Sequence, residues 1–225
     1  MSHNIAGKGT VMIEIQNLTK VFQEQTVLQN INATFDAGLI HGVIGKNGAG
    51  KTVLLRLLCG LMHPSKGQVI VDGKQLGKDV DFAPDAGIII ETPCFLPYLS
   101  GFQNLKELAS IRNIISKEEI AEAMEQVKLD PSSRKHVGKY SLGMRQRLGI
   151  AQAIMERPRY LILDEPMNGL DTQGMEDVRE LLQKQKETGV TVILASHSME
   201  DIRLLCDTVH RIQDASLIPC TTEFS

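Results

Sequence analysis

The feature that most constrains the fold is a glycine-rich stretch, GKNGAGKT, at residues 45–52. It matches the pattern G-x-x-x-x-G-K-[ST] and stands between two apolar segments, as expected for a loop that joins a strand to a helix. The glycines let successive backbone N–H groups turn toward one anion, and the N-terminus of the helix adds partial positive charge. This spacing favours a phosphate-binding loop over an ordinary glycine-rich turn. We therefore predict that the chain binds a nucleoside triphosphate.

The loop residues divide the predicted work of holding the nucleotide. Lys51 is expected to reach the β- and γ-phosphates, and the hydroxyl of Thr52 to bind Mg²⁺. The guanine-recognition pattern N-K-x-D does not occur in the sequence, so a GTPase is disfavoured. ATP and Mg²⁺ are the expected cofactors. The other residues of this region predicted to contact the nucleotide are Gly45, Lys46, Asn47, Gly48, Ala49, Gly50 and Val53.

Length and composition bound the remaining possibilities. The 225 residues suffice for one domain, with or without a sub-lobe, and a substantial core. A net charge of −3 gives no electrostatic footprint for nucleic acid, so no nucleic-acid partner is expected. No apolar stretch approaches the roughly 20 residues of a membrane span, so any membrane role is expected to come through a partner. The four cysteines lack C-x-x-C spacing, which indicates a cytosolic protein without disulfides or a structural metal.

The first third of the chain predicts strands around the phosphate loop. Residues 1–11 are interpreted as a tag or a disordered end, with a natural start at Met12. Alternating apolar residues from 12 to 35 predict half-buried antiparallel strands. A buried strand at 39–44 leads into the loop, and a helix at 51–62 follows it. Further strands are expected at 67–73 and 86–90.

The rest of the chain predicts a helical lobe and then a return to α/β structure. Residues 101–129 have a helical pattern, with a capping box from Ser116 to Glu119. We expect a lobe at about 95–157 inserted into one domain, residues 12–218, with a tail at 219–225. The predicted fold is α/β, a P-loop NTPase with a largely parallel core sheet, an N-terminal antiparallel β subdomain and an inserted helical lobe. The later elements expected are helices at 141–157 and 172–188 and strands at 160–165 and 190–196.

A buried strand ends in two consecutive carboxylates, in the sequence YLILDEP. Asp164, at the strand end beside the phosphate loop, is expected to hold Mg²⁺. Glu165 is expected to orient and deprotonate the attacking water. An acidic strand-to-loop transition is common, but its occurrence in a chain with a phosphate loop favours the catalytic interpretation.

A second anion-binding helix N-terminus is predicted at YSLGM, where Ser141 can cap a helix and Gly143 permits close backbone approach. The chain could use both anion sites on one nucleotide or offer one of them to a second copy of itself. On its own, the pattern S-x-G before a helix is typical of a simple cap.

The order of these motifs resembles the ATP-binding subunit of ABC transporters. The phosphate loop, Ser141–Met144, Asp164 with Glu165, NGLD at 168–171 and His197 follow one another as in that family, over roughly residues 12–217. The resemblance implies that two subunits pair head to tail, as a homodimer or a heterodimer, and enclose each ATP between one phosphate loop and the other subunit's Ser141 and Gly143. It also implies that 168–171 cross the dimer interface.

The resemblance assigns three further roles. His197 corresponds to a switch histidine that contacts the γ-phosphate and the water. Phe22 corresponds to the aromatic residue that stacks on adenine, although a Phe there could equally belong to the core. A separate transmembrane permease is the implied partner, which places the subunit on the cytoplasmic face of the cell membrane.

Two departures from the family pattern indicate which subgroup of the family the chain resembles. The usual L-S-G-G-Q reads YSLGM here, so a thioether at Met144 replaces the usual amide. Glu91 stands where the family has a glutamine, and its carboxylate is expected to ligate Mg²⁺. These variants resemble exporters of peptide antibiotics, such as bacitracin and lantibiotic self-protection transporters. The segment 92–105, rich in apolar residues, is expected to transmit motion to the permease, although a covered loop is the other interpretation.

Two other classes of protein remain alternatives. A soluble ABC ATPase acting on DNA or ribosomes would be expected to have coiled coils or tandem cassettes. A phosphotransferase with a phosphate loop would leave Ser141–Met144 and 168–171 without a role.

Overall fold

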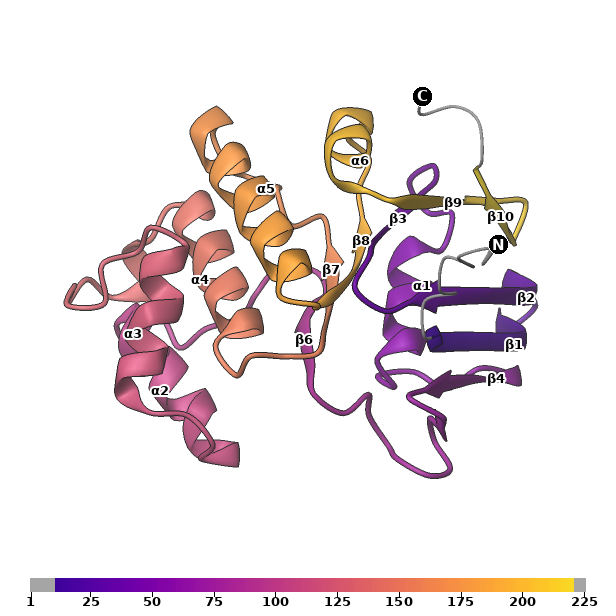
Figure 1. Cartoon of the computed structure of the whole chain (residues 1–225), viewed down its shortest axis with the longest axis horizontal. Coiled ribbons are helices and arrows are strands. Elements are labelled where there is room, and N and C mark those ends of the chain that lie inside the picture. Colours follow the sequence, from indigo (N-terminus) through magenta and orange to yellow (C-terminus); the bar gives the residue numbers. More distant parts are fainter. Residues whose placement is uncertain (1–10, 221–225) are drawn as a thin grey trace, which may run out of the picture.

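A computed structural model describes residues 11–220 of the chain. The N-terminal segment interpreted as a tag or a disordered end lies outside the described residues up to residue 10. The predicted tail lies outside them after Cys220. Within the described part, the N-terminal strands lie at one end of the molecule and the helices of residues 101–154 at the other (Figure 1).

The smaller sheet is antiparallel and comes from the N-terminal part of the chain, as predicted. Its strands lie in the order β2-β1-β4-β5. Ile13 and Ile15 of β1 are buried two residues apart, whereas the buried Leu28, Ile31 and Phe35 of β2 are three and four residues apart. Register shifts between the two strands interrupt strict alternation. The strand bounds are β1 Val11–Phe22, β2 Gln25–Asp36, β4 Lys66–Val71 and β5 Lys74–Gln75.

The larger sheet has the order β10-β9-β3-β8-β7-β6 and is parallel except for β10. Every residue of β3, β7 and β8 is buried, because this sheet is covered on both faces. The prediction of a largely parallel core sheet is confirmed. The strand bounds are β3 Ile40–Ile44, β6 Ala86–Ile89, β7 Tyr160–Asp164, β8 Thr191–Ala195, β9 Thr208–Gln213 and β10 Ser216–Pro219.

Three helices flank the larger sheet. Helix α1 (Lys51–Leu58) lies between the two sheets (Figure 1), and its buried leucines share a core cluster with both of them. Helices α5 (Thr172–Glu187) and α6 (Met199–Leu205) lie on the other face. Helix α1 is shorter than predicted, because the chain turns at Gly60, whose φ is +83°.

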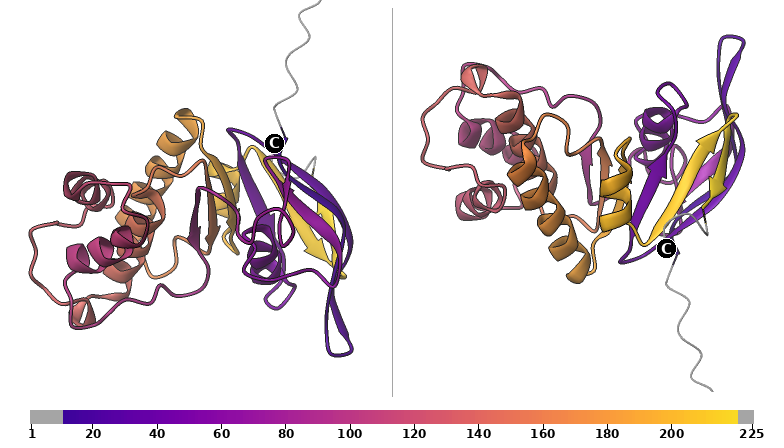
Figure 2. Two further views of the ribbon diagram at one scale, coloured as in Figure 1. Left: turned by 90° about the horizontal axis from the view of Figure 1, so that it is seen from below. Right: turned by 90° about the horizontal axis from the view of Figure 1, so that it is seen from above.

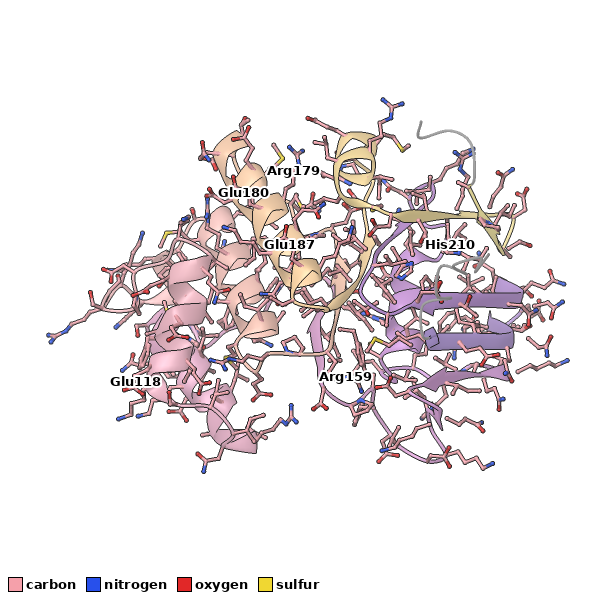
Figure 3. All side chains as sticks on the ribbon, viewed as in Figure 1. Glu118, Arg159, Arg179, Glu180, Glu187 and His210 are labelled. Atoms are coloured by element: carbon pink, nitrogen blue, oxygen red, sulfur yellow. The ribbon has the colours of Figure 1, made fainter. Side chains whose placement is uncertain are left out.

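An ion pair fastens α5 to α6. Arg179 of α5, labelled in Figure 3, lies between the two helices. Its Nε and Nη2 donate to Oδ1 of Asp201 at 2.9 and 2.5 Å. Both side chains are largely buried, so removing either one would leave a desolvated charge without its partner.

The helical lobe contains α2 (Gly101–Arg112), α3 (Lys117–Gln126), a short 3-10 turn (Val137–Lys139) and α4 (Leu142–Ile154). Both further views place this lobe at the end of the molecule away from the smaller sheet, with α5 next to it (Figure 2). Its helix α4 packs against β6 of the larger sheet. The predicted capping box at Ser116 and Glu119 is confirmed. A second capping box, Ser100 with Gln103, begins α2 and was not predicted. Within residues 11–220, none of the helices combines the length and apolarity that a membrane crossing requires.

Candidate active site

The phosphate loop lies between β3 and α1, as its sequence predicts. At three of its positions, steric constraints explain why the residue is glycine. Gly48 and Gly50 have φ of +77° and +106°, a region that favours glycine. Gly50 is also the N-cap of α1. A Cβ on Gly45 would lie 2.9 Å from the carbonyl oxygen of Ile212, so β9 leaves no room for a side chain there. The loop is thereby held in one compact turn at the N-terminus of a helix.

Lys51 folds back over this loop. Its side chain is only 8% exposed, and Nζ donates to the carbonyl oxygen of Gly45 at 2.9 Å and lies 3.5 Å from that of Lys46. The ammonium is therefore held at the anion-binding turn before any phosphate arrives, where a phosphate can replace the carbonyl acceptors.

Thr52 and Asp164 meet across the gap between α1 and β7. The Thr52 hydroxyl donates to Oδ2 of Asp164 at 2.5 Å, and Asp164 is 7% exposed. The parallel sheet brings Thr52 and Asp164 together, because Val43 of β3 and Asp164 of β7 are both in register with Ala195 on the intervening strand β8. The carboxyl ends of β3 and β7 thus open at one edge, where open α/β sheets bind ligands.

This pair fits a magnesium ion. Mg²⁺ prefers oxygen ligands and is usually held by one or two protein oxygens together with substrate phosphates and water. Within residues 11–220, no group of three or more His, Cys, Asp or Glu side chains is placed to hold a metal on its own. A hydroxyl and a buried carboxylate beside a phosphate loop are a donor set suited to a metal that arrives with the nucleotide.

Glu165 and His197 come together at the same edge. Nδ1 of His197 lies 2.8 Å from Oε2 of Glu165, and the backbone N–H of His197 donates to the same oxygen at 3.3 Å. Glu165 has a φ of +49°, an unusual value for a residue with a side chain. Its N–H donates to the carbonyl oxygen of Ala195 at 2.9 Å. The chain reverses direction after β7 in a left-handed residue, a type of backbone strain that clusters at functional sites.

A cleft of about 1020 Å³ brings many of the predicted residues together. Phe22, at the end of β1, lines it with 41% of its surface exposed, and Nζ of Lys20 lies 4.9 Å from the centre of its ring. An exposed ring at the rim of a polar cleft can stack on a planar base. His197 lines a neighbouring cleft of about 650 Å³ on the other side of the loop. The predicted residues that line the larger cleft are Phe22, Asn47, Gly48, Gly50, Lys51, Thr52, Val53, Glu91, Asp164 and Glu165, and those that line the smaller one are Gly45, Lys46, Asn47, Gly48, Ala49 and His197.

Glu91 lines the larger cleft but is engaged by a residue that was not predicted. Nη2 of Arg56, on α1, lies 2.6 Å from Oε1 of Glu91. The Glu91 side chain is 62% exposed, and its φ is +63°. Exposed ion pairs contribute about 0–1 kcal/mol, so this contact leaves the carboxylate free to exchange partners.

Ser141 and Gly143 lie at the N-terminus of α4 and line neither cleft. The Ser141 hydroxyl accepts from the N–H of Met144 at 3.1 Å, so the predicted cap is present. A Cβ on Gly143 would lie 3.0 Å from the carbonyl oxygen of Gly169, so this helix end packs closely on the 168–171 loop. Leu142 lies between them and reaches the edge of the larger cleft. Ser141 and Gly143 thus lie on either side of a residue of the larger cleft without lining that cleft themselves.

One buried polar residue near the site was missed. Gln146 of α4 is 6% exposed and lines the larger cleft. Its Nε2 donates to the carbonyl oxygen of Pro166 at 3.0 Å. A glutamine within a helical pattern carries no sequence signal that separates it from a solvent-exposed one.

Comparison with known sequences identifies similar proteins over most of the chain. A family model described as "ABC transporter" matches residues 28–168. The uncharacterized ABC transporter ATP-binding protein YybJ of Bacillus subtilis is 47% identical over 87% of this chain and 90% of its own length. The bacitracin transport ATP-binding protein BcrA of Enterococcus faecalis is 41% identical over 92% of this chain and 68% of its own. The lantibiotic transport ATP-binding protein SrtF of Streptococcus pyogenes is 35% identical over 92% and 89%.

Solved structures agree on the fold. A structure described as the ATP-binding subunit of an ABC transporter superposes with a TM-score of 0.84 at 26% identity, over 94% of this chain and 90% of that one. The dimeric MJ0796, a bacterial ABC transporter cassette, gives a TM-score of 0.81 at 24% identity, over 92% and 96%.

Proposed function

The chain belongs to the ABC transporter ATP-binding family and is an ATPase subunit of a transporter, and we propose that it powers the export of peptide antibiotics or similar amphiphiles. The bacitracin and lantibiotic transport relatives support this class of substrate. The observation that supports ATP hydrolysis is the meeting of Lys51, of Thr52 with Asp164, and of Glu165 with His197 at one edge of the parallel sheet. The relatives named above are ATP-binding proteins of ABC transporters, so neither a soluble ATPase nor a phosphotransferase gains support.

The proposed chemistry assigns each side chain a step. The loop N–H groups and Lys51 bind the β- and γ-phosphates, and Phe22 stacks on adenine. A carboxylate oxygen of Glu165 accepts the proton of the attacking water, whose oxygen displaces ADP from the γ-phosphorus and forms inorganic phosphate. His197, held by its contact with Oε2, keeps that carboxylate in place and contacts the γ-phosphate and the water. Thr52, Asp164 and Glu91 would hold Mg²⁺, which supplies charge neutralisation on the phosphate oxygens when bound.

The second anion site is proposed to act in trans. The absence of Ser141 and Gly143 from the walls of both clefts beside their own phosphate loop supports a contact with the ATP of another subunit. The helix dipole and the N–H groups of the first turn of α4 favour an anion there. Supporting this pairing, the MJ0796 cassette is described as dimeric. The partner is proposed to be a second copy or a close paralogue.

A groove between β6, the loop after it and α4 is the proposed contact for a separate permease. It measures about 420 Å³ and lies where β6 and the loop after it meet α4, with Ile88, Pro93 and Gly149 in its wall. Nearby in sequence, Leu96 and Tyr98 are 44% and 63% exposed. An apolar groove with exposed aromatic and aliphatic neighbours fits a helix of a membrane-embedded partner. This contact would hold the subunit at the cytoplasmic face of the membrane.

Bacitracin tolerance tests the export function. Cells that express the chain together with its permease are expected to grow at higher bacitracin concentrations than cells that express either one alone. The minimum inhibitory concentration provides the measurement. Equal concentrations for all three strains, with bacitracin and a lantibiotic tested in parallel, would contradict export of this class of peptide.

Changing Glu91 to Gln tests its proposed role as a metal ligand. An amide binds Mg²⁺ more weakly than a carboxylate, so Glu91→Gln should raise the Mg²⁺ concentration for half-maximal ATPase activity. Nucleotide binding without metal should stay equal or improve, because a negative charge near the γ-phosphate is removed. A Mg²⁺ titration of the isolated subunit measures this, with exposed Glu107→Gln as the matched control. An unchanged midpoint would show that Glu91 serves another purpose, such as coupling to the permease.

A further inference from the structure

The buried amide of Gln146 has no role in the chemistry described so far. It lies on α4, five residues after the cap Ser141, and points into the body of the molecule rather than to solvent. Its Nε2 is 3.0 Å from the carbonyl oxygen of Pro166 and 3.5 Å from that of Glu165. Both acceptors are backbone atoms in the turn directly after β7.

These acceptors belong to the segment that sets the direction of the Glu165 side chain. Glu165 is left-handed, and its N–H is tied to β8 through the carbonyl oxygen of Ala195. On the C-terminal side of Glu165, its own carbonyl oxygen and that of Pro166 face the amide of Gln146. A residue with a side chain stays at positive φ only where its surroundings fix it. The two sets of contacts hold the backbone of Glu165 from both sides.

Helix α4 is firm enough to serve as an anchor. Arg147, the next residue, donates through Nη1 to the carbonyl oxygen of Val127 and through Nη2 to Oδ2 of Asp177, both at 2.9 Å. The hydrogen bond from this guanidinium holds the pKa of Asp177 below its usual range. Leu148 and Ile150 are fully or nearly fully buried on the same helix. The amide of Gln146 is therefore presented from a helix fixed to α3, to α5 and to the core.

We infer that Gln146 is a positioning residue for ATP hydrolysis, which holds the turn after β7 so that the Glu165 carboxylate faces the attacking water. The inference rests on the proposed role of Glu165 as the base. It has a consequence for the pair of sites, because Ser141 and Gln146 share one helix. An ATP bound to the partner's phosphate loop would contact the N-terminus of α4. A shift of this helix would move Gln146 and, with it, the turn that carries Glu165 in this chain's own site.

The variant Gln146→Met tests the inference, since methionine has similar length and volume but cannot donate a hydrogen bond. A misplaced general base slows the chemical step but does not weaken ATP binding. We therefore expect kcat to fall by roughly 10- to 100-fold while KM changes less than about twofold. Affinity for a fluorescent ATP analogue should match that of the wild type. The matched control is Gln183→Met, a partly exposed glutamine on α5, which should retain the wild-type kcat.

A second variant gives a signature that a merely structural residue would not produce. In Gln146→Glu the ionised carboxylate faces carbonyl oxygens and cannot donate, whereas the protonated acid restores an O–H donor at the same position. Burial raises the pKa of such a carboxyl. The ratio of the Gln146→Glu rate to the Gln146→Met rate should therefore rise several-fold as the pH is lowered from about 7.5 to about 5.5. Taking the ratio cancels the titration of groups common to both variants.

The outcomes separate this inference from the proposed function. Wild-type kcat in Gln146→Met, or a raised KM with unchanged kcat, would overturn the inference while leaving ATP hydrolysis by Glu165 intact. A ratio that stays flat with pH would also overturn it, and this holds even where the methionine variant has a lowered melting temperature. If Glu165→Gln hydrolyses ATP at the wild-type rate, the proposed base itself is wrong.

Discussion

Replacing Lys51 by alanine is expected to abolish ATP binding at nucleotide concentrations that saturate the wild-type chain. The buried ammonium is already held at the mouth of the loop, 2.9 Å from the carbonyl oxygen of Gly45, so it needs little rearrangement to meet a phosphate. Hydrogen bonds to charged groups contribute up to about 3 kcal/mol, and their loss lowers affinity roughly 100-fold or more. Titration with a fluorescent ATP analogue measures the effect.

A matched control separates this loss from a general effect of removing a lysine. Lys74→Ala removes an exposed lysine on β5, distant in sequence from the loop, and should leave both ATP affinity and melting temperature unchanged. ATP affinity within twofold of wild type in Lys51→Ala would refute the phosphate-binding role of the loop.

Glu165→Gln should bind MgATP normally and hydrolyse it slowly. The amide is close in size to the carboxylate and can still meet the His197 ring, but it cannot accept the proton of the attacking water. A positioned general base contributes about 10²- to 10⁴-fold to the rate, so kcat should fall within that range while the affinity for ATP is retained. Phosphate release and equilibrium nucleotide binding measure the two quantities separately.

The control for this change is Glu176→Gln, an exposed glutamate on α5, which should hydrolyse ATP at the wild-type rate. Wild-type turnover in Glu165→Gln would place the base elsewhere, and Glu91, which lines the same cleft, is then the first residue to examine.

The sequence predicted much of this site because its main parts are local or follow from sheet topology. The phosphate-loop motif at residues 45–52 can be recognised locally, because it requires only a strand before it and a helix after it, and both are present. Asp164, Glu165 and His197 stand at the ends of buried apolar runs. Parallel strands place such ends at one edge, which is why residues 30 or more positions apart meet without any local signal.

The parts that were not predicted depend on tertiary distances. Arg56 reads as an ordinary helix residue, and only the folded position of the loop after β6 brings it to Glu91. Gln146 is polar within a helical pattern, so its burial against the turn after β7 could not be inferred. Helix α6 and strands β9 and β10 escaped prediction because their segments are short and have mixed polarity. The pairing of β9 with β3 is what places Ile212 against the phosphate loop.

We propose that the phosphate loop of one chain and the Ser141 of another enclose the same ATP. The most direct test is the mass of Glu165→Gln in MgATP, measured by light scattering during size-exclusion chromatography. We expect twice the 24.8 kDa of the chain with ATP and a single chain without it. The double variant Ser141→Arg/Glu165→Gln should remain a single chain with ATP. A single chain at saturating ATP, or a dimer that Ser141→Arg leaves intact, would contradict it.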